Sequence, residues 1–78
     1  MNTQAAIRKK INEIVAEQGK TICDISLKGG ITPATIYSIM SGKSKKAHVV
    51  SIKKFCEGAG ITLGQFFSAS YFDEPELD

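Results

Sequence analysis

Residues Thr21–Lys43 read TICDISLKGGITPATIYSIMSGK, and this stretch predicts two short helices joined by a tight turn. Thr21 and Asp24 are close to a capping box, in which the hydroxyl accepts a free amide of the first turn and the acid favours the positive end of the helix dipole. The apolar stripe then ends at the pair Gly29-Gly30, where a residue with positive φ can stop a helix. We therefore expect a helix of about two turns that ends at this glycine pair.

The second helix of the pair has a clearly marked start. Thr32 can cap it, and Pro33 suits the first helical position, where no amide is needed. Three apolar residues at helical spacing form one buried stripe before Gly42 ends the helix, namely Ile36, Ile39 and Met40. The residues left on the outward face are small or polar around a single aromatic ring: Ala34, Thr35, Tyr37, Ser38 and Ser41.

Three lysines follow the second helix directly: Lys43, Lys45 and Lys46. Two short helices, a glycine-containing turn and a lysine cluster form the sequence pattern of a helix-turn-helix, whose second helix enters the major groove of DNA. Helical hairpins with nearby lysines also occur in small domains that do not bind nucleic acid. On this pattern alone, both interpretations stay open.

Length and charge limit the size of the fold and the kinds of partner. A chain of 78 residues is expected to form one domain with a small core. Its formal net charge is +2, but residues 1–72 carry ten Lys or Arg against four acids, which is +6. That asymmetry suits a polyanionic partner, although solvated helical surfaces can be equally basic. The cluster Arg8-Lys9-Lys10 fits a solvated surface better than a phosphate contact. Without a long apolar run or a secretory signal, we expect a cytoplasmic protein with no membrane partner.

The reactive residues do not form the pattern of an enzyme. Cys23 and Cys56 lie within helical patterns without CxxC spacing, and we expect them to be small, mostly buried side chains. His48, which has no ligand partner at a helical spacing, is expected at a helix start or on the surface. There is no paired-carboxylate pocket, no nucleophile beside a histidine and no phosphate loop, so we expect no catalytic site, no cofactor and no metal.

Three further helices are expected around the central pair. The first begins after Asn2 or Thr3 and runs to about Gln18, the fourth runs from about Val49 to Glu57 and is ended by Gly58 and Gly60, and the fifth opens at a capping box formed by Thr62 and Gln65. These helices predict an all-α domain over residues 1–69, followed by an acidic, flexible tail over residues 70–78. Within the tail, Tyr71 and Phe72 are expected either to pack back on the domain or to meet a partner chain.

The helix order, the segment GITPATIYSIMSGKSKK and the closing segment SIKKFCEGAGITLGQFF together resemble the lambda-repressor-like, Xre/Cro-type DNA-binding domains. The likeness covers roughly residues 4–68, and it is strongest to the small standalone members found in Gram-positive bacteria and their mobile elements. It implies a five-helix, all-α fold with the helix-turn-helix at the second and third helices.

The same resemblance implies a sequence-specific transcriptional regulator that binds double-stranded DNA, and we expect a repressor that acts by occupying its operator. Base readout would fall on Pro33, Ala34, Thr35, Tyr37 and Ser38. Phosphate contacts would fall on Thr21, Thr32, Ser41, Lys43, Lys45 and Lys46. Such proteins usually bind two half-sites as homodimers, formed either in solution or only on DNA.

One departure and one alternative qualify this expectation. Many relatives have glutamine where this chain has Ile22 and Pro33. Isoleucine and proline side chains cannot hydrogen-bond a base as glutamine does, so the base code of the relatives does not transfer.

The alternative is an antitoxin-like or adaptor module that uses the same fold to hold a protein partner. Its contact surface would be Tyr71, Phe72 and the acidic tail.

Overall fold

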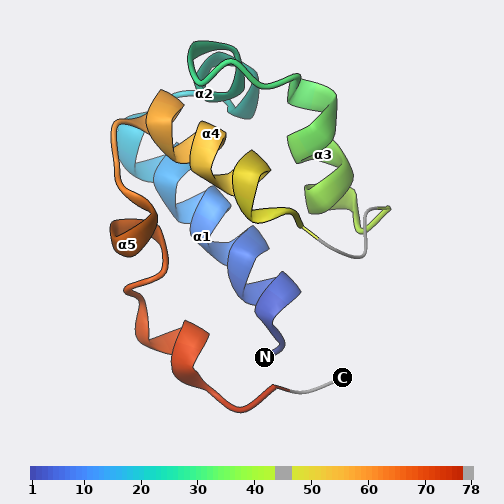
Figure 1. Ribbon diagram of the computed structural model, residues 1–78, viewed down its shortest axis with the longest axis vertical. Helices are drawn as coiled ribbons and strands as arrows, with labels where there is room; N and C mark the ends of the chain where they lie inside the picture. The colour runs from blue at the N-terminus through green and yellow to red at the C-terminus, as the bar shows by residue number, and fades with distance from the viewer. Residues whose placement is uncertain (44–46, 77–78) are drawn as a thin grey trace.

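The computed structural model describes residues 1–43 and 47–76, and those residues form helices, turns and loops with no strand. The elements are α1 (Thr3–Gln18), α2 (Ile22–Lys28), α3 (Pro33–Ser41), α4 (Val49–Ala59), α5 (Leu63–Phe66) and the 3-10 helix η1 (Ser70–Asp73). In Figure 1, α4 passes in front of α1, α2 lies across one end, α3 stands at one side and α5 lies on the other. The expected all-α fold, with the helix-turn-helix formed by the second and third helices, is confirmed.

Side-chain caps fix most of the helix starts. The Asn2 side chain accepts a hydrogen bond from the Ala5 amide at 2.8 Å, and the Thr21 hydroxyl accepts one from the Asp24 amide at 3.0 Å. Thr62 and Gln65 form the reciprocal capping box, because each side chain accepts from the other residue's amide. Thr32 differs from expectation, since its side chain makes no capping bond, and α3 starts on Pro33 at its first turn.

Helix α4 is longer than the sequence pattern predicted. The helix was expected to stop at Glu57, but it continues to Ala59 and ends at Gly60, which has a φ of 76°. Gly58 therefore lies inside the helix, and its glycine identity needs another explanation than chain termination.

That explanation is a contact between the backbones of α2 and α4. A Cβ atom on Gly58 would lie 2.0 Å from the carbonyl oxygen of Ile25, and one on Gly29 would lie 1.9 Å from the carbonyl oxygen of Lys54. Neither carbonyl can move away without breaking its own helix. The two glycines therefore allow α2 to lie directly on α4, and α3 takes its place by packing against α2.

The core is built mainly from isoleucine and phenylalanine side chains. Its fully or nearly fully buried members come from α1 to α5 and the loop before α3: Ile7, Ile11, Ile14, Ile25, Ile31, Ile36, Ile39, Ile52, Phe55, Cys56 and Phe66. At one end, Phe66 lies with its ring centre 4.9 Å from that of Phe67, and Phe72 of η1 lies 4.9 Å from Phe67. This aromatic group closes the core beneath α5.

The segment after residue 69 makes contacts with the first helix. The Tyr71 hydroxyl donates to Glu13 at 3.0 Å, and the ammonium of Lys9 lies 4.6 Å from the centre of the Tyr71 ring. Further along, Glu74 pairs with the N-terminal amine at 3.2 Å. Tyr71 and Phe72 thus pack back on the domain, and contacts cross the expected boundary at residue 69; the flexibility of the tail stays a prediction.

We expect Gly58→Ala to lower the free energy of unfolding by about 3 kcal/mol or more, because the added methyl group must displace backbone rather than a side chain. Chemical denaturation followed by circular dichroism measures this change. Gly64→Ala is the matched control, since its Cβ would meet only the Thr62 hydroxyl at 3.7 Å. The control should be neutral or stabilising by up to about 1 kcal/mol. Equal effects at both positions would contradict the backbone contact.

A second stability prediction concerns Ser26, which is 0% exposed and whose hydroxyl has no hydrogen-bond partner. Ser26→Ala should raise the free energy of unfolding by about 1–2 kcal/mol, because an unpaired buried hydroxyl is removed and the helix gains a better helix former. Ser51→Ala, at a half-buried position of α4, is the control, because it measures the gain from helix propensity alone. Destabilisation by Ser26→Ala alone would show that the hydroxyl is satisfied in the fold.

Candidate nucleic-acid interface

Helix α3 stands at the side of the bundle and buries only one face. Ile36 and Ile39, three residues apart, are buried against the core, and the helix packs on α2 (Figure 1). Gly42, with a φ of 81°, ends the helix. The opposite face of α3 is therefore open along the length of the helix.

That open face carries most of the residues expected to read bases. Residues 34, 37, 38 and 41 repeat at spacings of three and four, so they share one side of the helix. The Tyr37 side chain is 48% exposed, which is high for a large aromatic residue. Pro33 and Thr35 fall on the flanks of the helix instead, and the Pro33 ring is half-buried.

The open face encloses a hollow of about 370 Å³. It is lined by Ala34, Tyr37, Ser38, Ser41 and Lys43. Four of these come from the face of α3 and the fifth from the residue just beyond its glycine cap. The hollow therefore brings together three expected base-reading residues and two expected phosphate contacts, whereas Pro33 and Thr35 lie outside it.

Ser41 makes two hydrogen bonds within the chain. Its hydroxyl donates to the carbonyl oxygen of Ser38 at 3.3 Å and accepts from the amide of Lys43 at 3.4 Å. The second bond ties Lys43 to the last turn of α3, where the lysine side chain is exposed. The expected phosphate contact of Ser41 stays a prediction. Sequence periodicity places Ser41 on this face, but it cannot reveal these two bonds.

The remaining expected phosphate contacts lie at helix starts or outside the described residues. Thr21 accepts a hydrogen bond from Asp24, so the proton of its hydroxyl stays available to a phosphate. The exposed Thr32 side chain makes no capping bond. Lys45 and Lys46 fall within residues 44–46, outside the described ranges.

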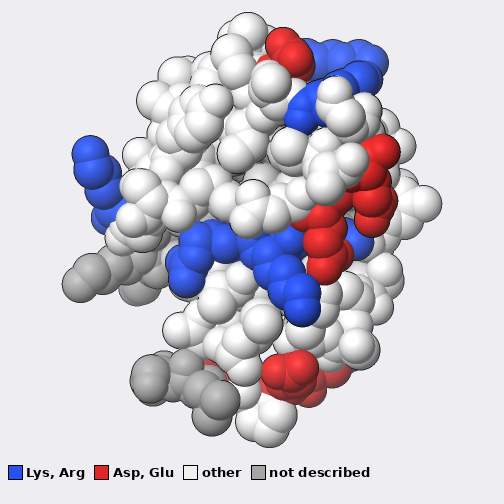
Figure 2. Space-filling view, turned by 180° about the vertical axis from the view of Figure 1, so that it is seen from behind, with Lys and Arg blue, Asp and Glu red and all other residues white. Residues whose placement is uncertain are grey.

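The basic cluster of α1 is engaged within the chain. The Lys9 ammonium lies over the Tyr71 ring, and the Lys10 ammonium lies 3.9 Å from Glu13. Figure 2 shows the face that contains this part of α1, with acidic side chains beside the basic ones. The interpretation of this cluster as ordinary surface is therefore favoured over a phosphate-binding patch.

The cysteines and the other potential ligands offer no alternative site. Burial and the nearby Glu57 raise the pKa of Cys56 to about 11, so its thiol stays protonated at neutral pH. Cys23 is half-buried. His48 is the exposed N-cap residue of α4 and makes no side-chain capping bond. Among residues 1–43 and 47–76 no three His, Cys, Asp or Glu side chains gather as metal ligands would, and none of the helices found there has the length and apolar character needed to cross a membrane.

Comparison with known proteins adds a structural relative. No family model matches the chain, and no curated protein matches it. The crystal structure of the prophage Lp1 protein 11 is similar to this chain, with a TM-score of 0.80 and 25% sequence identity over 96% of this chain and 100% of the other. The chain therefore shares a small all-helical fold with a prophage protein over nearly its whole length, in agreement with a small helix-turn-helix-like domain.

Proposed function

We propose that the protein is a sequence-specific DNA-binding regulator of the Xre/Cro type, which inserts α3 into the major groove. The observation that carries this proposal is the open face of α3, where small and polar side chains surround an exposed tyrosine and an exposed lysine follows at the helix end. An α-helix with its side chains is about 10–12 Å across, which matches the roughly 12 Å width of the major groove.

The chemistry of the face suggests how bases are read. Ala34 offers a methyl group to the methyl group of thymine, and Tyr37 and Ser38 offer hydroxyl groups to base edges or phosphates. The face of α3 contains no Arg, Asn or Gln, the residues that make bidentate contacts worth about 1–3 kcal/mol each. Discrimination at each half-site is therefore weaker than in readers that use such contacts.

Affinity then depends on the DNA backbone. Lys43 is held at the end of α3 by the hydrogen bond that its backbone amide donates to the Ser41 hydroxyl, and the hydroxyl groups of Thr21 and Thr32 are available as donors. From the sequence, Lys45 and Lys46 add two charges directly after Lys43. Since each phosphate contact releases counterions, binding should fall steeply with salt.

We further propose that the protein represses transcription by occupying its operator in the cytoplasm, with no catalytic step and no cofactor. Occupancy requires only the surfaces that bind DNA. The similarity to a prophage protein agrees with a regulator of the kind found on mobile elements. A homodimer on an inverted repeat is the expected form on DNA.

The alternative, a protein-interaction module, has lost part of its basis. Its contact surface was expected at Tyr71, Phe72 and the acidic tail. In the structure, however, the Tyr71 hydroxyl donates to Glu13, and Phe72 packs against Phe66 and Phe67. Both side chains are half-buried within the chain itself. The open face of α3 favours DNA as the partner.

Selection from a random duplex library at about 0.1 M salt tests the proposal. An enriched inverted repeat with half-sites about one helical turn apart is the expected result. Binding without enrichment would reduce the function to nonspecific lysine contacts, and no binding would return the protein-interaction module to first place.

Tyr37→Ala should change the sequence that is selected, because it removes the largest side chain of the reading face. We expect the preference for the best site over a single mismatch beneath Tyr37 to fall by roughly 1 kcal/mol. Leu27→Ala is the control, since Leu27 is an apolar residue on α2 that is even more exposed, at 63%. An unchanged preference in Tyr37→Ala would mean that α3 does not read bases.

Lys43→Ala should weaken binding to all duplexes by a similar factor. The slope of the logarithm of the association constant against the logarithm of salt concentration should become shallower by about 0.9, the value for one phosphate contact. Fluorescence anisotropy at several salt concentrations measures both effects. Lys28→Ala, at the far end of α2 from Thr21, is the control and should leave the slope unchanged. If Lys43→Ala weakened binding to one duplex only, Lys43 would instead contribute to base readout.

A further inference from the structure

A second hollow lies between α4 and α5, away from the open face of α3. Its volume is about 260 Å³, and it shares no residue with the α3 hollow. The volume is slightly below the roughly 300–1,000 Å³ of sites that hold drug-sized ligands, so the hollow fits a smaller molecule. Six residues line it: Lys53, Cys56, Glu57, Ile61, Thr62 and Leu63.

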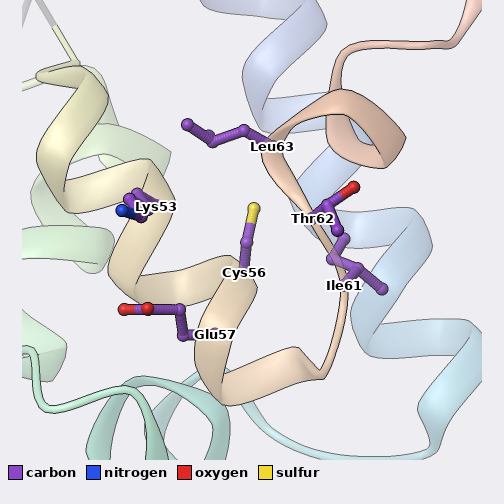
Figure 3. Close-up of a pocket in the computed structure, with 6 residues that line it drawn as sticks. All are labelled: Lys53, Cys56, Glu57, Ile61, Thr62 and Leu63. Atoms are coloured by element: carbon purple, nitrogen blue, oxygen red, sulfur yellow. The ribbon is translucent and has the colours of Figure 1, made fainter.

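The floor of the hollow is apolar. Figure 3 shows the sulfur of Cys56 and the side chain of Leu63 pointing into the space between the two helices. Burial is the main cause that raises the pKa of Cys56 to about 11, so the thiol stays protonated and acts as a small, weakly polar group. Ile61 and Leu63 are both half-buried beside it. This part of the hollow therefore suits the alkyl group of a ligand.

Two opposite charges lie at the rim of this apolar floor. Lys53 and Glu57 line the hollow from consecutive turns of α4, and both side chains are exposed. Side chains four residues apart on a helix are neighbours, but lysine before glutamate is the less favourable order for an ion pair. The two ion pairs found within residues 1–43 and 47–76 instead involve Glu74 and Glu13. Both charges at the rim are therefore available to a ligand.

The two charges restrict the class of ligand. A simple carboxylate beside Lys53 would also lie near Glu57, and a simple amine beside Glu57 would also lie near Lys53. Each of these ligands would therefore meet a like charge. A zwitterion avoids both repulsions, because its carboxylate can face the lysine while its ammonium faces the glutamate.

We propose that the hollow between α4 and α5 binds the zwitterion of a small aliphatic α-amino acid of the size of leucine. The alkyl group lies against Cys56 and Leu63, the carboxylate faces Lys53 and the ammonium faces Glu57. An α-amino acid joins these three groups at one carbon atom, which matches two charges on neighbouring helical turns above an apolar floor. This binding goes beyond the proposed DNA binding and does not depend on it, because no residue of the α3 hollow takes part.

Titration of the isotopically labelled full chain with L-leucine, without DNA, tests the proposal through the NMR shifts of the backbone amides. We expect saturable shifts confined to α4, α5 and the loop between them, with a dissociation constant on the order of 1 mM. Isocaproate lacks the ammonium of leucine and isoamylamine lacks its carboxylate, so each should bind roughly threefold or more weakly. Glycine lacks the alkyl group and should bind roughly tenfold or more weakly.

Two variants assign the charges to their partners. Lys53→Met should weaken leucine binding by roughly threefold or more and should remove the preference for leucine over isoamylamine. Glu57→Gln should weaken leucine binding to a similar degree and should remove the preference for leucine over isocaproate. Lys54→Met is the matched control, because it removes an exposed charge from the same helix at a position that does not line the hollow.

Three results would overturn the proposal: no saturable shifts up to the solubility limit of leucine, equal binding of leucine and isocaproate, or leucine binding that neither Lys53→Met nor Glu57→Gln weakens. Selection of duplexes by the same protein is a separate measurement. A chain that selects an operator but does not bind leucine would reject the amino-acid site and leave the proposed function intact. A chain that binds leucine but no duplex would do the reverse.

Discussion

The contact between the backbones of α2 and α4 is the constraint on which the rest of the fold depends. Gly29 and Gly58 lie where any side chain would strike the carbonyl of the other helix. The absence of two Cβ atoms lets the helices meet, and this closeness leaves Ser26 fully enclosed. A small domain has little apolar surface to bury, so the close approach also raises the number of dispersion contacts that each core residue makes.

This contact also determines which surfaces are available for function. Helix α2 lies on α4, α3 packs against α2 with Ile36 and Ile39 in the core, and the other face of α3 is left open. Both ends of α3 are formed by local features of the chain. Pro33 starts the helix, Gly42 ends it, and a hydrogen bond to Ser41 holds Lys43 beside the last turn. At the other end, Phe66, Phe67 and Phe72 close the core, so the C-terminal segment is used for packing against α1.

Local signals in the sequence predicted most of the fold and placed part of the candidate site on one face of α3. Caps such as Asn2 and the Thr62–Gln65 box act over three residues, so helix starts could be predicted from the sequence alone. Gly58 was misread as a helix end because its role depends on Ile25, thirty-three positions away in the printed sequence. Helical periodicity predicted Ala34, Thr35, Tyr37, Ser38 and Ser41 on the outer face, and of these Thr35 lies on its flank. Pro33 was included through the family resemblance and also lies on a flank. The two bonds of Ser41 join it to residues only three and two positions away, but serine can make such bonds at many positions, so helical periodicity does not report them.

Because of the composition of the α3 face, a second copy of the chain on the DNA would increase sequence discrimination. A face without Arg, Asn or Gln gains little discrimination from one half-site, because its contacts are methyl groups and single hydroxyl groups. Two linked copies add the discrimination of two half-sites, and binding of the first raises the effective concentration of the second, which can strengthen binding by about 10²–10⁴-fold without a new base contact. Only modest affinity between the copies is needed, since DNA itself holds them together once both are bound. A weakly discriminating α3 face is therefore consistent with a mechanism in which specificity comes from the spacing of two half-sites as much as from the bases within each.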